Sequence, residues 1–267
     1  MLKRSARIPL PPEGDGPLRA ISVEEKRGDG GFAEGLRVAV PALIIALVIR
    51  AMMFEAFTIP SGSMKATLLV GDYLFVSKYS YGFSHYSLPF SPRWFSGRLF
   101  GAMPRRGDVV VFRLPKDDSI DYIKRVIGLP GDRIKVVDGL IFINGKAVRR
   151  ERIDDFIDNE GGVPVKVPRW QETLPNGVSY QTLGLQDGPL ENTDEYEVPP
   201  DHFFMMGDNR DHSADSRVLS AVGYVPFENL IGKAQVIFFS VADNEATPGF
   251  WNWPRAVRWN RLFTAVR

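Results

Sequence analysis

The stretch DYIKRVIGLPGDRIKVVDGLIFING, residues 121–145, decides the fold class. Its apolar residues form short runs at 122–127, 134–137 and 140–143, and runs of this length between turn residues are typical of β-strands. Two dipeptides that favour tight hairpin turns, Asp138-Gly139 and Asn144-Gly145, follow the second and third runs. The stretch therefore predicts consecutive strands joined by hairpins.

The same pattern extends over most of the chain beyond about residue 57. Further short apolar runs lie at 73–76, 108–112, 203–206 and 234–240. The 25 Gly and 20 Pro residues, together with 18 Phe, favour many turns between short apolar strands. Residues 132–200 are richer in turn and acidic residues than their flanks. We therefore expect a mainly β core domain in two parts, 57–131 and 201–242, with a smaller β-rich domain, 132–200, inserted between them.

Composition excludes several classes of function. The 33 basic residues nearly balance the 32 acidic ones, and a net charge of +1 offers no basic field for a phosphate backbone, so we expect no nucleic-acid partner. Cysteine is absent, which excludes disulfides, a thiol nucleophile and cysteine metal sites. His85 and His202 have no partners at metal-ligand spacing, so we expect no metal and no cofactor.

The N-terminal region is different in character. Residues 1–35 carry many Pro, Gly and charged residues and predict a disordered tail. Residues 36–56 are mostly apolar, and a helix from 36 to 57 is about 33 Å long, close to one bilayer core. This predicts a single transmembrane helix with Arg50 and Glu55 near its far end. The alternatives are a buried helix of a soluble domain and a cleaved signal peptide; no A-x-A site supports the latter.

Basic residues set the expected orientation. Four of them lie near the N-terminal end of the apolar segment, namely Arg19, Lys26, Arg27 and Arg37, whereas only Lys65 lies within about twenty residues after it. The tail is then cytoplasmic, and the rest of the chain faces the periplasm from the inner membrane. The C-terminal segment, 243–267, interleaves Trp with Arg, a composition that suits a phospholipid headgroup interface. The alternative is a C-terminal helix that packs on its own domain.

Three clusters carry side chains that suit chemistry. The first, FTIPSGSM at 57–64, holds Ser61 and Ser63 on either side of a glycine, although serines in such places are mostly turn residues. In the second, strand alternation turns Lys124 toward apolar neighbours, and burial lowers the pKa of a lysine toward the range of a general base. The alternative is a lysine that extends from a strand edge to solvent.

The third cluster, GDNRDHSADSR at 207–217, follows an apolar run. Its density of Asp, Asn, Ser and Arg predicts an ordered, hydrogen-bonded loop, with Asp215 and Arg217 as a possible ion pair. A calcium loop is the competing interpretation, because Asp211, Ser213 and Asp215 alternate. The loop lacks the glycine and the bidentate glutamate of that motif, since Ser216 and Val222 stand there.

In this order, after an N-terminal apolar segment, the three clusters resemble the bacterial type I signal peptidases, which are membrane-bound serine endopeptidases. The resemblance covers about residues 51–240. It implies a signal-peptidase-type β catalytic domain, acting as a monomer on the signal peptides of exported preproteins.

The resemblance also implies roles for individual residues. Ser63 matches the nucleophile, and Lys124 matches the base that takes its proton. Ser61 and the Ser63 backbone N–H match the oxyanion hole. Ser213 matches the hydroxyl that orients the lysine, with Asp208, Asp215 and Arg217 as supporting loop residues. The substrate pocket matches five apolar or aromatic positions: Phe57, Ile59, Leu68, Tyr122 and Ile123.

Two residues depart from the family pattern: Ala66 stands where proline is usual, and His212 where asparagine is usual. His212 admits an alternative triad with Ser63 and an aspartate. Two further alternatives are a self-cleaving Ser/Lys protease of the repressor type and an inactive, membrane-tethered β module that binds extended peptides.

Overall fold

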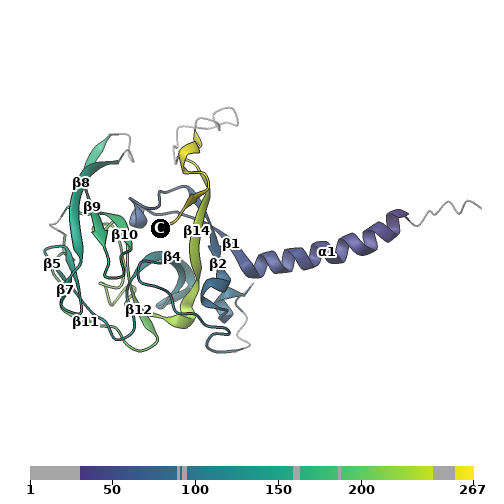
Figure 1. Cartoon of the computed structure of the whole chain (residues 1–267), viewed down its shortest axis with the longest axis horizontal. Coiled ribbons are helices and arrows are strands. Elements are labelled where there is room, and N and C mark those ends of the chain that lie inside the picture. Colours follow the sequence, from purple (N-terminus) through teal and green to yellow (C-terminus); the bar gives the residue numbers. More distant parts are fainter. Residues whose placement is uncertain (1–30, 89–90, 92–94, 159–162, 186–187, 243–255) are drawn as a thin grey trace, which may run out of the picture. The chain divides into compact units, whose positions relative to one another are not determined.

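A computed structural model describes residues 31–88, 91, 95–158, 163–185, 188–242 and 256–267 (Figure 1). The predicted disordered tail lies outside the described residues up to residue 30. So do the first thirteen residues of the C-terminal segment, 243–255.

The N-terminal helix α1 runs from Gly31 to Met53 and contains Pro41. This helix begins earlier and ends earlier than the predicted transmembrane range, 36–56, and that range stays a prediction. Residues 31–35 are helical and not part of a disordered tail. The helix ends before Phe54 because the next five residues form a strand, β1 (Phe54–Thr58), whose backbone pairs with the following strand of the sheet. No helix among the described residues is both long enough and apolar enough to cross a membrane.

The largest sheet has eight strands and supports most of the residues discussed below (Figure 1). Its order is β1-β2-β14-β3-β4-β12-β13, with β15 paired to β14, and the described pairings are antiparallel. The strands after β1 are β2 (Asp72–Ser77), β3 (Val109–Leu114), β4 (Asp117–Gly128), β12 (His202–Met206), β13 (Val225–Pro226), β14 (Leu230–Ser240) and β15 (Thr264–Ala265).

Two smaller antiparallel sheets lie in the sequence between β4 and β12. One has the order β10-β9-β8, with β8 (Arg149–Asp158), β9 (Val165–Thr173) and β10 (Ser179–Leu183). The other has the order β11-β5-β6-β7, with β5 (Arg133–Val137), β6 (Leu140–Ile143), β7 (Lys146–Ala147) and β11 (Tyr196–Glu197). The prediction of a mainly β fold is confirmed. The domain boundaries at 57–131, 132–200 and 201–242 stay a prediction.

The two predicted hairpin turns are present. Asp138 and Gly139 join β5 to β6 with φ of 48° and 71°, and Asn144 and Gly145 join β6 to β7 with φ of 53° and 76°. A two-residue turn with both φ values positive matches the twist of the flanking strands. The sequence pattern missed β8, β9 and β10. Charged residues interrupt the apolar alternation of β8 and β9, and β10, SYQTL, is short and has only two apolar residues.

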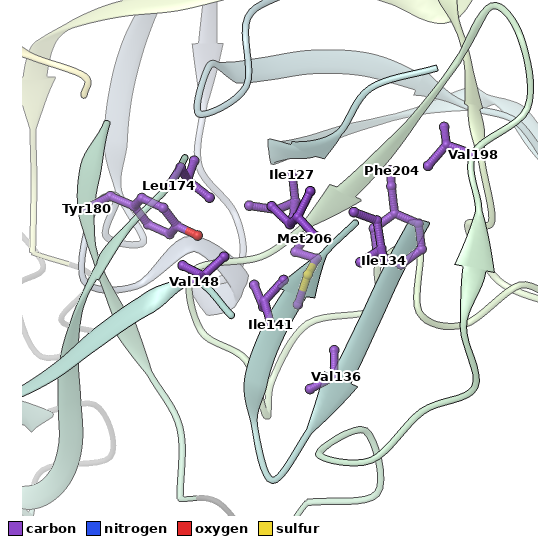
Figure 2. Packing of buried hydrophobic residues seen from close by; sticks show 11 residues of the cluster. Ile127, Ile134, Val136, Ile141, Val148, Leu174, Tyr180, Val198, Phe204 and Met206 are labelled. Carbon is purple, nitrogen blue, oxygen red and sulfur yellow. The ribbon is translucent and has the colours of Figure 1, made fainter. Parts of the chain in front are cut away.

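One apolar cluster joins the eight-stranded sheet to the four-stranded one (Figure 2). Ile127 of β4 and Phe204 of β12 pack with Ile134 of β5 and Ile141 of β6, and all four side chains are fully buried. Full burial of a side chain of this size contributes about 1.5–3 kcal/mol. The cluster therefore fixes the end of β4, the strand that also carries Lys124.

We expect Phe204→Ala to lower the free energy of unfolding by about 3–5 kcal/mol, because it leaves a cavity between the two sheets. The matched control is Phe100→Ala, since Phe100 is 89% exposed, and its effect should stay within about 0.5 kcal/mol. Urea unfolding followed by circular dichroism measures both values. Equal effects of the two substitutions would contradict the packing described for Phe204.

Candidate active site

Ser63 lies on a short 3₁₀ turn, η1 (Gly62–Met64), that follows β1. The apolar side chain of Met64 is fully buried and anchors the turn in the core. The loop of the third sequence cluster holds the turn from the other side: the Asn209 backbone N–H donates to the Ser63 carbonyl oxygen at 3.1 Å, and its side-chain amide donates to the Gly62 carbonyl oxygen at 3.0 Å. The position of the Ser63 hydroxyl is therefore set by two distant segments.

Lys124 reaches this hydroxyl from the middle of the sheet. Its Nζ lies 2.7 Å from Ser63 Oγ, and it also donates to the carbonyl oxygen of Ile123 at 3.0 Å. The residue is 3% exposed, and its burial lowers the pKa of the ammonium to about 8, although Asp215 and Asp208 oppose that shift. A neutral amine so close to a serine hydroxyl is suited to remove its proton.

A cavity of about 630 Å³ opens onto Ser63 and Lys124. Four of the five predicted pocket residues line it, namely Phe57, Ile59, Tyr122 and Ile123. The fifth, Leu68, does not: it is fully buried in the core cluster behind the turn. The lining is mostly apolar, so the cavity suits small apolar groups next to the hydroxyl.

Ser61 also lines the cavity and is exposed. Its hydroxyl oxygen lies 3.4 Å from Ser63 Oγ. A donor in this place lies beside the position where charge develops when Ser63 attacks a carbonyl group.

Each of the two supporting aspartates is buried against an arginine. Asp208 accepts hydrogen bonds from Arg125 Nε at 2.8 Å and Nη2 at 2.7 Å, and Asp215 accepts from Arg217 Nε and Nη2, both at 2.9 Å. Burial raises the pKa of Asp215, but the Arg217 guanidinium and the Gly207 N–H outweigh it, so this pKa lies below its ordinary value. The predicted Asp215–Arg217 pair is present, and Arg217 occupies both carboxylate oxygens that the calcium interpretation needs.

Ser213 is buried in the same loop. Its hydroxyl helps to lower the pKa of the neighbouring Asp215, but it makes no hydrogen bond of ordinary geometry with any described residue. The role of orienting Lys124, which the family resemblance implies for Ser213, therefore stays a prediction. Gly207 is required at this point, because an added Cβ would lie 2.2 Å from Ser213 Oγ and 2.5 Å from the Ser63 carbonyl oxygen.

Sequence reasoning missed Asn209 and Arg125 as parts of the site. Both stand inside the quoted clusters, yet nothing in their spacing shows that Asn209 binds the serine turn or that Arg125, fully buried, binds Asp208. His212 is exposed at the wall of the cavity, and among the described hydrogen bonds Ser63 Oγ is joined to Lys124 and Ser61. The geometry therefore favours the lysine over the histidine as the base.

Ala66, the other departure from the family pattern, follows the serine turn with a φ of 85°. An L residue in this region carries backbone strain of about 1–3 kcal/mol, and a proline ring, fixed near −65°, does not fit it. The alanine is therefore compatible with the turn as it is built here, whereas the usual proline is not.

We expect Ala66→Gly to stabilise the protein by about 0.5–1 kcal/mol, because glycine adopts positive φ without strain. Ala66→Pro should cost about 3 kcal/mol or more. Ala147→Gly on exposed β7 is the control; it should destabilise by about 0.5–1 kcal/mol, the opposite sign. Denaturant midpoints measure all three, and a destabilising Ala66→Gly would contradict the strained turn.

Comparisons with known proteins identify the family of this chain. Residues 32–239 match the model of the family described as signal peptidase, peptidase S26. Signal peptidase I of Rickettsia canadensis is 47% identical over 239 residues, which cover 82% of this chain and 88% of that protein. Signal peptidase I of Rickettsia prowazekii is 46% identical over 241 residues, covering 83% of this chain and 89% of that protein.

A solved signal peptidase I from Enterococcus faecalis is 24% identical and covers 49% of this chain at a TM-score of 0.30, a similarity too low to bear on the fold. The family match and the Rickettsia relatives, by contrast, extend over most of the chain, including the serine turn, β4 and the loop at 207–217. The chain belongs to the signal peptidase family, peptidase S26.

Proposed function

We propose that this serine endopeptidase cleaves N-terminal signal peptides from exported preproteins with Ser63 as nucleophile and Lys124 as general base. The observation that carries the proposal is the 2.7 Å contact between Lys124 Nζ and Ser63 Oγ in a buried site. A lysine with a pKa of about 8 is partly neutral at physiological pH, whereas an ordinary lysine is almost wholly protonated. The burial of the amine therefore supplies the base.

In the first step Lys124 takes the proton of the Ser63 hydroxyl as its oxygen attacks the scissile carbonyl carbon. The tetrahedral intermediate carries its negative charge on the former carbonyl oxygen. The Ser61 hydroxyl and the Ser63 N–H donate to that oxygen, and loss of one such donor typically costs about 2.7–4 kcal/mol of transition-state stabilisation. Lys124 then gives its proton to the leaving amine, and an ester remains on Ser63.

In the second step water attacks the ester. Lys124 accepts a proton from this water, a second tetrahedral intermediate forms, and its collapse returns the proton to Ser63 Oγ and frees the signal peptide's new carboxylate. No metal or cofactor takes part. Asp208 and Asp215 act on Lys124 through their charges. Arg217 binds Asp215 and so helps to hold the loop in place.

The substrate binds in an extended conformation beside β1. This strand is the last in its sheet and pairs with β2, and its residues 56–58 line the cavity. An edge strand offers main-chain donors and acceptors to an added strand. The apolar cavity walls at Phe57, Ile59, Tyr122 and Ile123 then select small side chains at the cleavage site.

We further propose that the apolar segment 36–56 anchors the enzyme in the inner membrane as a single span, with the N-terminus cytoplasmic and the catalytic domain periplasmic. Large apolar side chains of α1 are exposed, among them Val38 at 70%, Leu43 at 61% and Ile44 at 54%. Such a surface is stable in lipid and costly in water.

The enzyme works as a monomer. Its C-terminal segment contacts phospholipid, because two large aromatic side chains are exposed there: Trp259 is 64% exposed and Phe263 is 77% exposed.

The domain organisation proposed with this function has a catalytic domain in two parts, 57–131 and 201–242, around an inserted domain, 132–200. The strands β5 to β11 all fall within the insertion and belong to the two smaller sheets. The catalytic serine and lysine come from the first part, and the supporting loop from the second.

We expect Ser63→Ala and Lys124→Ala each to lower kcat at least about 10³-fold, because each removes one member of a two-residue catalytic unit.

In the wild type kcat/KM should rise about tenfold per pH unit below a midpoint near 8 and level off above it, since the base acts only when neutral. Cleavage of a preprotein in detergent measures both.

His212→Ala is the matched control and should keep both the rate and the midpoint. A serine-directed acylating inhibitor should label Ser63 in the wild type. Activity lost in His212→Ala but kept in Lys124→Ala would instead establish a histidine base, and a wild type that neither cleaves nor is labelled would support the peptide-binding module.

We expect the full chain to stay with membranes after washing at alkaline pH, because a spanning helix is not extracted by that treatment. The double variant Leu43→Asp/Ile44→Asp should be released, since a charge at the centre of a span costs about 2.5–3.5 kcal/mol. Lys146→Asp, on exposed β7, should stay in the pellet. Release of the wild type would contradict the span.

A further inference from the structure

A buried carboxylate outside the proposed catalytic machinery lies at the centre of the three-stranded sheet. Glu172, on β9, is 1% exposed. Its cross-strand neighbours are Tyr180 on β10 and Arg150 on β8. The Tyr180 hydroxyl donates to Glu172 Oε2 at 2.8 Å, and Arg150 Nε lies 3.8 Å from Oε1. A carboxylate so fully removed from water is costly unless cations and donors compensate it.

The principal compensation comes from the loop of the active site. Arg210 donates to Glu172 Oε1 from Nη1 at 2.9 Å and to Oε2 from Nη2 at 2.6 Å. Arg210 is 4% exposed, and burial lowers its pKa, but Glu172, Tyr180 and Asp208 together outweigh burial and raise it. The pair is bidentate and buried, so each partner depends on the other.

Arg210 in turn holds the loop at 207–217 closed. Its Nε donates to the Gly207 carbonyl oxygen at 3.2 Å, and its own carbonyl oxygen accepts from Arg217 Nη2 at 2.7 Å. Arg217 binds Asp215, whose carboxylate also accepts from the Gly207 N–H at 3.1 Å. A closed ring of hydrogen bonds therefore joins Arg210 to Asp215, one of the carboxylates that act on Lys124.

The backbone makes the same connection. Arg210 N–H donates to the Leu183 carbonyl oxygen at 2.8 Å, and Leu183 N–H donates to the Asp208 carbonyl oxygen at 2.9 Å. The end of β10 thus pairs with the loop on both sides of Asn209, the residue that holds the serine turn. The small sheet is attached to the catalytic loop by main chain and by one buried ion pair.

We propose that Glu172 is a positioning residue for the general base: through Arg210 it fixes the 207–217 loop, and with it the places of Asp215 and Asp208 relative to Lys124. This inference rests on the proposed function. It gives the three-stranded sheet, which contributes no residue to the lining of the cavity, a direct part in the chemistry.

The sign of the effect follows from the charges. Asp215 and Asp208 raise the pKa of Lys124 against the larger effect of burial. If Arg210 loses its carboxylate partner, the loop loosens, both aspartates act on Lys124 more weakly, and an unpaired Arg210 cation adds repulsion. Both changes favour the neutral amine, so the pKa of Lys124 falls, while the geometry for proton transfer deteriorates.

The test compares Glu172→Gln with the wild type as full chains in detergent, using a preprotein substrate and a pH series. We expect kcat to fall about tenfold with KM within about twofold, and the midpoint of the acidic limb of kcat/KM to move down by about one pH unit. Glu172→Asp, which keeps the charge, should return the midpoint toward the wild-type value. Glu151→Gln is the control: it removes a carboxylate from exposed β8 of the same sheet and should change neither quantity.

Wild-type kcat and midpoint in a folded Glu172→Gln would overturn the proposal. A lower kcat with an unmoved midpoint would also overturn it, because that is the result expected of a purely structural residue.

If Glu172→Gln does not fold, Tyr180→Phe replaces it in the test, because it removes one donor without uncovering a charge. It should lower kcat about threefold and move the midpoint in the same direction, and wild-type values would overturn the proposal. In either case, loss of cleavage in Lys124→Ala shows that the proposed function stands independently; a wild type without activity overturns both.

Discussion

Removal of the Lys124 amine from water is the constraint on which the site depends. An ammonium in the interior is unstable without a nearby anion, and its burial brings the pKa down to about 8. The same burial places Nζ at 2.7 Å from the serine hydroxyl. A lysine at the surface has neither the lowered pKa nor the short distance to the hydroxyl. Lys124 has both because the β-sheet buries it.

Burial of the amine is balanced by carboxylates that are themselves held by arginines. Asp208 is bound by Arg125, and Asp215 by Arg217. Because each carboxylate already has a bidentate partner, its negative charge reaches Lys124 only in part, and the amine is not returned to an ordinary pKa. These pairs account for the many buried charged side chains around Ser63 and Lys124. The pKa of the lysine depends on the positions of these charges, so the positions must be fixed.

The serine turn shows a second kind of constraint, which lies in the backbone. Ser63 is presented by a single 3₁₀ turn between β1 and a strained residue, Ala66. Three residues hold this turn: one belongs to it, and two come from the loop at 207–217. Met64 anchors it below, Asn209 binds two of its carbonyl oxygens, and Gly207 leaves room for it beside Ser213. A short turn has too few internal hydrogen bonds to fix a nucleophile, so the rest of the domain supplies them.

The sequence by itself determined the mainly β fold and the two hairpin turns, because alternation and Gly-containing turns are local signals. It proposed Ser63 and Lys124 as a pair only through the family resemblance, and the tertiary structure brings the two side chains within 2.7 Å. It placed the end of the helix too late, since Phe54–Thr58 is apolar enough for either state and only pairing with β2 selects the strand. It missed β8 and β9, whose charged residues interrupt the alternation, and β10, which is short and has only two apolar residues. Only the tertiary structure decided that Leu68 belongs to the core, that Asn209 and Arg125 belong to the site, and that Glu172 lies behind the loop. These are contacts between segments 38 to 147 residues apart, and the physical reason is that burial and charge pairing are properties of the packed chain, not of neighbouring residues.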